Sequence, residues 1–304
     1  MKADTLVIVN PVAGGGRALR SSVAVADYFA EQGQNVEFSE SRSSHDLREQ
    51  AARAAATGFQ YVIALGGDGA FHHLVEGLRG TGAIAGLLPA GNGNDIARAL
   101  GIPPDPLRAA DAFLRSSPRT IDLVRTSVAG KGTAYFVGAG GMGLDAEAAH
   151  LANTKFKRWP GVTRYLAGAF SAFFAGNAFE LTAEMDATSW SGRALLAVVA
   201  NAPCYGSGVR IAPDAKMDDG LLDVVLVGEV PWTRLVEAIP ILLTSGDLRF
   251  DEVERFRCRR VKLEADRCVM VHGDGEILGE SPAEFEVVPG AIRVMTPQHS
   301  VLKR

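Results

Sequence analysis

Two glycine-rich stretches that contain acidic residues carry the side chains best suited to chemistry. The Gly-Gly-Asp-Gly stretch at 66–69 follows an apolar run, and the Gly-Asn-Gly-Asn-Asp stretch at 91–95 follows the next one. Glycines can take positive φ and admit a ligand close to the backbone, and a helix that begins there aims free N–H groups at an anion. A carboxylate in such a turn repels phosphate unless a metal ion lies between them. Asp68 therefore predicts a Mg²⁺-nucleotide site.

A purely structural interpretation remains open for both stretches. Asp68 would then cap a helix that starts near Ala70, and Asn94 or Asp95 would cap the helix that follows the second stretch. Both stretches, however, follow successive strands of one predicted parallel sheet, whose carboxyl ends face a common ligand crevice. We therefore expect Asp95 to face the same ligand as Asp68.

The elements that must position these loops alternate between strand and helix patterns. The predicted strands are 6–9, 36–39, 61–65, 84–88 and 119–124, and the predicted helices end near residues 32, 56 and 114. Repeated strand and helix units of this spacing predict a right-handed parallel sheet with helices on both faces. The fold class is α/β, with a Rossmann-like nucleotide-binding domain over residues 1–122.

After residue 122 the strands become more frequent and the loops shorter, which indicates an antiparallel β-rich domain over residues 123–290. We expect residues 291–304 to return to the first domain. Residues 155–174 interrupt the strands with a basic, aromatic lead-in to an amphipathic helix. The Gly-x-Gly-x-x-Gly match at 138–143 lacks the helix and acidic residue that a dinucleotide site requires, so we interpret it as a chance match.

The bulk composition excludes several classes of protein. The chain has 304 residues, 47% of them hydrophobic, and a formal net charge of −4, which argues against general nucleic-acid binding. Three cysteines without metal-site spacing argue against a disulfide framework or a zinc site made from them, and favour the cytoplasm. The first residues have a strand pattern and not that of a signal peptide, and no apolar run reaches transmembrane length.

Several motifs in this order resemble the diacylglycerol kinase catalytic-domain family, in particular its soluble bacterial lipid kinases. They are Asn10-Pro11 with Gly14, the two glycine-rich stretches, Ile121-Asp122-Leu123, the run from Pro213 to Asp223, and the run from Val271 to Glu276. The resemblance covers nearly the whole chain. It implies a C-terminal β-sandwich that binds the acceptor, and ATP-dependent phosphorylation of a lipid hydroxyl, such as that of diacylglycerol, in the cleft between the two domains.

The resemblance also assigns roles to individual residues. The implied nucleotide-binding positions are Asn10, Pro11, Gly14, Ser41, Gly66, Gly67, Asp68, Gly69, Asn92, Gly93 and Asn94. Asp95 and Asp122 belong to the implied catalytic carboxylate network, and Glu276 matches the general base. A structural Mg²⁺ is implied at Asp219 and at the carbonyls of Lys216 and Leu221. Phosphoryl transfer needs such metal neutralisation and a carboxylate to take the hydroxyl proton.

The sequence departs from the common form of this family at four positions: Ala70, His72, His73 and Asn92. Ala70 lacks a hydroxyl that could contact phosphate. The two histidines lack metal-site spacing, and we interpret them as solvated helix residues, because a helix places neighbours on different faces. An effect on the acceptor side is the alternative.

Three classes of function remain in view. The first is a lipid kinase that uses ATP and Mg²⁺, with diacylglycerol, a sphingoid base, ceramide or another long-chain alcohol as acceptor. The second is a small-molecule kinase, as in NAD kinases, and the third is a non-catalytic nucleotide-binding module. A lipid kinase without a membrane span must take its substrate from a membrane surface. We therefore expect peripheral contact with the inner face of the membrane through residues 155–174, and the alternative is that Phe170, Phe173 and Phe174, at helical spacing, pack into the core. A homodimer is an open alternative.

Overall fold

The computed structural model describes residues 3–143 and 178–297. The chain divides into two compact units, one made of Met1–Ile121 with Gly290–Arg304 and the other of Asp122–Pro289. Strands β5 (Ser117–Val128) and β15 (Ala283–Thr296) each contribute residues to both units. The segment 155–174, expected to contact a membrane, lies outside the described residues.

The first unit is built around a parallel sheet. Its strands are β1 (Thr5–Val9), β2 (Val36–Glu40), β3 (Tyr61–Gly66) and β4 (Ile84–Pro89), in the order β2-β1-β3-β4. Arg293 and Val294 of β15 extend the sheet in parallel beyond β4. Strands β1, β3 and β4 are apolar and almost wholly buried, as expected of strands covered on both faces.

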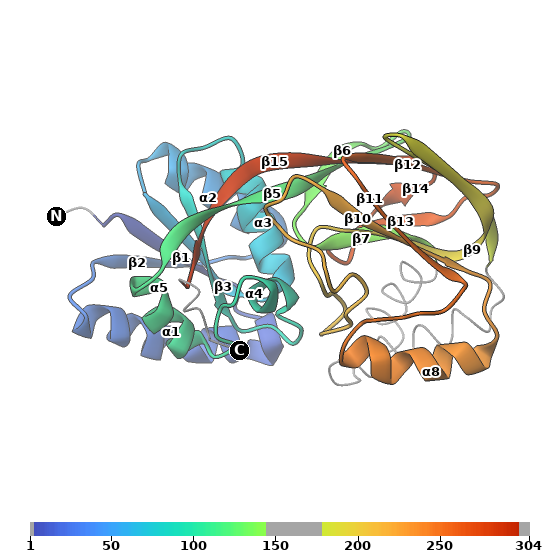
Figure 1. Ribbon diagram of the computed structural model, residues 1–304. Helices are drawn as coiled ribbons and strands as arrows, with labels where there is room; N and C mark the ends of the chain where they lie inside the picture. The colour runs from blue at the N-terminus through green and yellow to red at the C-terminus, as the bar shows by residue number, and fades with distance from the viewer. Residues whose placement is uncertain (1–2, 144–177, 298–304) are drawn as a thin grey trace. The chain divides into compact units, whose positions relative to one another are not determined.

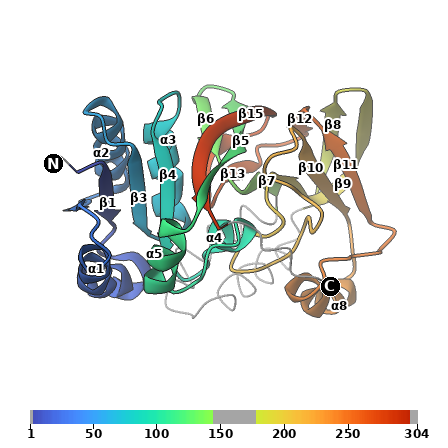
Figure 2. The same ribbon diagram turned by 60° about the vertical axis from the view of Figure 1, so that its left-hand side comes forward.

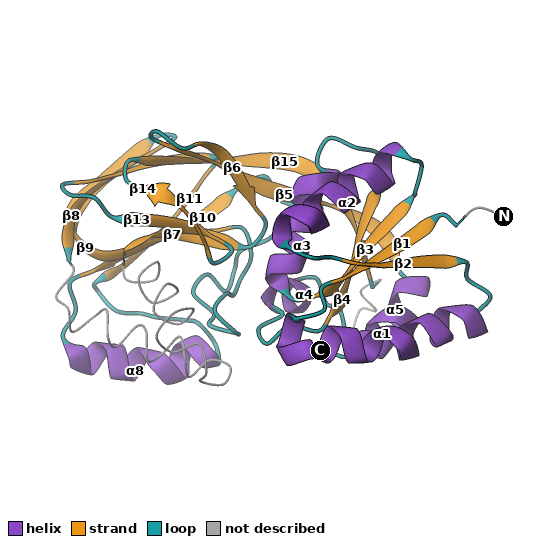
Figure 3. Ribbon diagram, turned by 180° about the vertical axis from the view of Figure 1, so that it is seen from behind, coloured by secondary structure: helices purple, strands orange, loops and turns teal. Residues whose placement is uncertain are grey.

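Helices cover both faces of this sheet, with α1 (Ala13–Glu31) and α5 (Pro106–Leu114) on one face and α2 (Ser44–Ala56) and α3 (Asp68–Leu78) on the other (Figure 3). The short helix α4 (Asp95–Ala99) follows β4. Local signals set the helix starts. The Ser43 hydroxyl accepts from Asp46 N (3.1 Å), and Asp105 caps α5 by accepting from the backbone of residues 107 and 108. The predicted parallel α/β domain is thereby confirmed.

The pair α1 and α5 is joined at its surface by a polar cluster. The Tyr28 hydroxyl donates to Asp111 Oδ1 (2.6 Å), and Arg115 pairs with the same carboxylate. The hydrogen bonds from Arg115, followed by the one from Tyr28, hold the pKa of Asp111 below its usual range. The bond to this carboxylate raises the pKa of Tyr28 in return.

The second unit is antiparallel and rich in strands, as predicted (Figures 1 and 2). Its strands besides β5 and β15 are β6 (Gly132–Phe136), β7 (Ala139–Gly143), β8 (Phe179–Met185), β9 (Thr188–Ala200), β10 (Leu222–Gly228), β11 (Val253–Cys258), β12 (Arg260–Ala265), β13 (Met270–Gly273) and β14 (Glu276–Glu280). They pair in the order β14-β13-β7-β9-β8-β12-β15, with β10 joining β9 to β11 and β6 pairing with β5.

The long strand β9 organises this unit. Its first half pairs with β8, and its second half lies between β7 and β10. One apolar cluster packs on each side of these strands, the larger around Phe136, Phe179 and Phe285 and the smaller around Val198 and Val225. The match at 138–143 lies largely in β7, a strand rather than a turn into a helix.

One helix of the second unit has no counterpart among the predicted elements. It is α8 (Trp232–Leu243), which precedes β11 and carries Pro240 inside its range. Within residues 3–143 and 178–297, no helix combines the length and the apolar character needed to cross a membrane.

Candidate functional site

The carboxyl ends of the first unit's strands are joined by backbone hydrogen bonds. Asn10 N donates to Leu65 O (3.0 Å), Ser41 N donates to Val9 O (2.9 Å), and Ala90 N donates to Gly66 O (2.6 Å). The Ser41 hydroxyl also donates to Val9 O at 3.2 Å. The predicted nucleotide-binding positions that follow β1, β2, β3 and β4 therefore lie along one edge of the sheet.

The glycines at 66–69 do not use their conformational freedom as expected. None of Gly66, Gly67 and Gly69 has positive φ, and α3 begins at Asp68 rather than near Ala70, with Gly67 extended at its N-cap. Gly66 and Gly67 are required instead because a side chain at either position would be too close to a neighbouring residue. A Cβ on Gly66 would lie 2.6 Å from the Cβ of Ala70, and one on Gly67 would lie 3.0 Å from Gly91 Cα. Because Gly66 and Gly67 have no side chains, this loop can pack closely against Ala70 and against Gly91 of the second loop.

Asp68 connects the two glycine-rich loops. Its Oδ1 accepts from Ile96 N at 2.9 Å, so Asp68 supplies the acceptor for the first turn of α4 from another part of the chain. The Asn94 side chain closes the second loop on itself, accepting from Gly91 N (2.9 Å) and donating to Gly91 O (3.0 Å). Asn94 has positive φ and makes no side-chain cap bond, so Asp68 does the capping.

The remaining predicted positions surround these two loops. Arg17 donates to the carbonyls of Ala90 and Gly91. Gly14 has φ of 59°, and a Cβ there would lie 2.1 Å from Ala90 O, so this close approach requires glycine. Asp95 is buried and pairs with Arg98, which also donates to Gly93 O. Asn92 is exposed, at the tip of the second loop.

The predicted site residues of the second unit belong to a different network, centred on Asp122. This residue is 3% exposed, its N donates to Met217 O (2.7 Å), and its Oδ2 accepts from Gly220 N (2.8 Å). The fully buried Asn201 donates from Nδ2 to the Asp122 carbonyl (3.1 Å) and to the Val137 carbonyl (2.8 Å). Asn201 is a candidate functional residue that sequence reasoning missed, because no local pattern marks it.

Glu276 follows a tight hairpin turn that is held in place by Asp274. Asp274 and Gly275 have φ of 51° and 85°, as a two-residue hairpin requires, and they join β13 to β14. The Asp274 carboxylate accepts from the backbone N atoms of Val137 and Gly138, both at 2.8 Å. Because Val137 is also bonded to Asn201, the turn is linked through that residue to Asp122. Glu276 itself is exposed.

The residues implied to hold a structural Mg²⁺ lie in the loop that leads into β10. Asp219 Oδ2 pairs with Arg257, and Arg257 Nε lies 3.5 Å from Asp223 Oδ1. The other oxygen of Asp223 is buried and has no hydrogen-bond partner among the described residues. Burial raises the pKa of Asp223. The Asp219 carboxylate and the orphaned oxygen of Asp223 are hard oxygen donors of the kind that suits Mg²⁺, and Arg257 is the cation that pairs with Asp219 in this structure.

The interpretation of His72 and His73 as solvated residues is wrong for His72, which is 4% exposed. The two rings lie edge to face with centroids 4.9 Å apart, although neighbours on a helix point in different directions. Glu76 explains this arrangement, because it is one turn away from both histidines and attracts both rings. Ala70 is also buried, at 3% exposure, and packs beside Gly66.

Both units match families of known proteins. Residues 4–126 match the diacylglycerol kinase catalytic domain, and residues 138–296 match the YegS C-terminal NAD kinase beta sandwich-like domain. A diacylglycerol kinase of Mycobacterium tuberculosis is 31% identical over 295 residues, which cover 96% of this chain and 94% of the relative. A Pseudomonas aeruginosa protein named "Probable lipid kinase YegS-like" is 32% identical over 306 residues, which cover 100% and 97%.

A crystal structure of a Bacillus anthracis diacylglycerol kinase shares the fold, with a TM-score of 0.72, 19% identity and 96% of each chain covered. The matches therefore extend over both units and not over the glycine-rich loops alone. They confirm the resemblance inferred from the motifs, and with it the expected enzyme class, a kinase. The chain belongs to the diacylglycerol kinase catalytic-domain family of lipid kinases.

Proposed function

We propose that this chain transfers the γ-phosphoryl group of ATP, with Mg²⁺, to the hydroxyl of a lipid such as diacylglycerol. The observation that carries the proposal is the bond from Ile96 N to Asp68, since it holds two glycine-rich loops together at the carboxyl ends of β3 and β4. Ligands of parallel sheets bind at that edge. Named relatives of the chain are diacylglycerol and lipid kinases.

The donor nucleotide binds the first unit in this proposal. The residues that contact it are those after β1, β2, β3 and β4, from Asn10 and Ser41 to the two glycine-rich loops, where the glycines carry no side chains. Mg²⁺ supplies neutralisation of the phosphate charge when it is bound. Asp68 and Asp95 are the carboxylates on this edge that would hold it, and the Arg98 pair holds Asp95 in place.

Glu276 takes the proton from the acceptor hydroxyl in the second unit. The Asp274 turn restricts the backbone before it, and Asp122 and Asn201 support the strand segment against which that turn is bonded. A general base must be held within hydrogen-bond reach of its proton, so this support has a catalytic purpose. Asp219 and the carbonyls of Lys216 and Leu221 would hold a structural Mg²⁺.

The test is an assay with labelled ATP, Mg²⁺ and a panel of diacylglycerol, sphingosine, ceramide and a long-chain alcohol in mixed micelles. Phosphorylation of diacylglycerol is expected, and phosphorylation of another lipid alone would replace the acceptor but keep the reaction class. Glu276→Gln should lower kcat by roughly 10²–10⁴ with nucleotide binding unchanged. Glu280→Gln, an exposed glutamate of the same strand, is the matched control.

Two results would contradict the proposal. Full turnover in Glu276→Gln would remove Glu276 as the base, and failure of the folded parent protein to phosphorylate any lipid would remove the lipid-kinase assignment. The structural metal has a separate test. Asp219→Ala should abolish the rise in Tm that Mg²⁺ gives the parent protein, because a bound ion stabilises the loop that holds it.

A further inference from the structure

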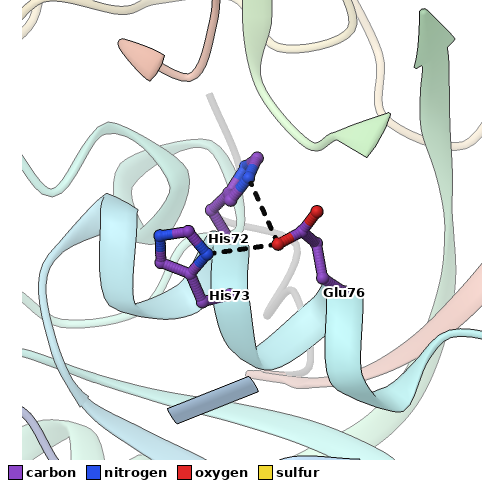
Figure 4. A group of neighbouring side chains, drawn as sticks. All are labelled: His72, His73 and Glu76. Atoms are coloured by element: carbon purple, nitrogen blue, oxygen red, sulfur yellow. Dashed lines mark hydrogen bonds and ion pairs between the residues drawn. The ribbon is translucent and has the colours of Figure 1, made fainter. Parts of the chain in front are cut away.

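Three metal-ligating side chains converge on one helix, apart from the residues assigned above. His72, His73 and Glu76 of α3 offer ligand atoms that all lie within 4.8 Å of one another (Figure 4). Glu76 Oε2 is 3.1 Å from His73 Nδ1 and 3.8 Å from His72 Nε2. The same carboxylate oxygen therefore faces both imidazoles and is hydrogen-bonded to His73, and a cation bound here would take the place of that bond.

The helix brings these groups together by its period. Glu76 is four residues after His72 and three after His73, and both spacings place side chains side by side on a helix surface. His72 is almost fully buried, while the side chains of His73 and Glu76 are 17% and 22% exposed. Burial limits the rotamers of His72, so metal binding loses less side-chain conformational entropy there, and the other two ligands are partly exposed to solvent.

Two of the three ligand separations are close to those around a small tetrahedral ion, and the two histidine nitrogens lie within 4.8 Å of each other. Zinc ligands at about 2.0–2.1 Å from the metal lie roughly 3.3 Å from one another in a tetrahedron. The two separations of 3.1 and 3.8 Å lie on either side of that value. Two imidazoles and one carboxylate form a borderline donor set that favours zinc and related transition metals over Mg²⁺. Three protein ligands leave a fourth position for water.

One charge opposes a cation here. Arg48 of α2 places Nη1 4.0 Å from Glu76 Oε2, and α2 packs against α3. Its side chain is 45% exposed, and a pair at this distance is weak, so the guanidinium can move into solvent when a divalent ion neutralises Glu76. The ion replaces one positive charge by two, adds coordination to both imidazoles, and so has a net electrostatic advantage at this site.

We propose that His72, His73 and Glu76 form a binding site for Zn²⁺ or a transition-metal ion of similar preference. This site is separate from the Mg²⁺ of the proposed function, both in its residues and in its ligand chemistry. Since α3 begins at Asp68, one turn before His72, a bound ion secures the helix that carries the first glycine-rich loop. Metal occupancy then stabilises the first unit.

The experiment titrates chelator-treated full-length protein with Zn²⁺ by calorimetry, and with Co²⁺ by visible absorption. A Cys268→Ser background removes the exposed thiol as a competing ligand. One zinc ion per chain is expected, with a rise in Tm and no competition from excess Mg²⁺. His73→Gln and Glu76→Gln should each weaken zinc binding by at least about tenfold. Substituting a residue that only hydrogen-bonds to a metal ligand already lowers metal affinity by about that factor.

The matched control is His45→Gln on α2, where His45 and Glu49 form an exposed pair at 3.7 Å to which the described residues add no third ligand. This variant should bind zinc as the parent does. Circular dichroism establishes that each variant is folded, and the two partly exposed ligands keep the test independent of the buried His72. The proposal is overturned if the folded parent binds no zinc, or if neither His73→Gln nor Glu76→Gln weakens binding.

Discussion

Asp68 has a structural role and a proposed role in nucleotide binding, and two substitutions separate them. As a hydrogen-bond acceptor it ties α4 to the loop before α3, through Ile96 N at 2.9 Å. As a charge it faces Mg²⁺-ATP in the proposed function. Asp68→Asn keeps an oxygen acceptor but removes the charge, whereas Asp68→Ala removes both. The two variants should therefore differ in stability and agree in loss of activity.

The expected magnitudes follow from the bond. A hydrogen bond to a charged group contributes about 1.5–3 kcal/mol, and a neutral one about 0.5–1.5 kcal/mol. Asp68→Ala should therefore lower the free energy of unfolding by about 1.5–3 kcal/mol, and Asp68→Asn by about 1 kcal/mol. At roughly 2–4 °C per kcal/mol for a unit of this size, Tm should fall by about 3–12 °C in the alanine variant. Differential scanning calorimetry without nucleotide measures both changes.

Activity is measured below the Tm of every variant, with labelled ATP and the accepted lipid. Asp105→Ala is the matched control, because it removes the N-cap of α5 and should cost about 0.5–2 kcal/mol without touching the proposed nucleotide loops. Its turnover per folded molecule should equal that of the parent. Parental turnover in Asp68→Asn would refute the metal-facing role. An unchanged Tm in Asp68→Ala would refute the stabilising tie.

Three further predictions concern other parts of the chain. Of the three cysteines, the exposed Cys268 should react with a thiol reagent at pH 8 while the buried Cys258, whose pKa burial raises to about 12, stays unmodified; rapid reaction of a second thiol in native protein would contradict this. The pKa of Asp111 is depressed, so its stabilisation is present above its unfolded pKa and is lost as the pH falls through the folded value. The Tm difference between the parent and Asp111→Asn should thus shrink between about pH 6 and about pH 2, and a constant difference would count against it. Gly91→Ala should destabilise the protein by about 1–3 kcal/mol in urea unfolding, because its Cβ would lie 2.5 Å from Gly67 Cα; an unaltered midpoint would mean that the loops separate freely.

Much of the first unit could be predicted from the sequence, because its signals are local. Apolar runs bounded by glycine, and caps such as Ser43 and Asp105, specify strands and helix starts within a few neighbouring residues. The two glycine-rich loops were recognisable for the same reason. The parallel order follows from the alternation of strand and helix, since each crossover returns the chain to the same edge.

The partners of individual side chains were decided only by the tertiary structure. The bond from Ile96 to Asp68 joins residues 28 positions apart, and Asn201 meets Asp122 across 79 positions. Such pairs depend on the order of the strands in the sheet and on the glycines that allow two loops to come into contact. Neither can be recognised from the sequence around each residue. Burial of His72 is of the same kind. The residue types predict a helix at this position. Which face of α3 becomes buried is decided by its packing against the sheet and against α2.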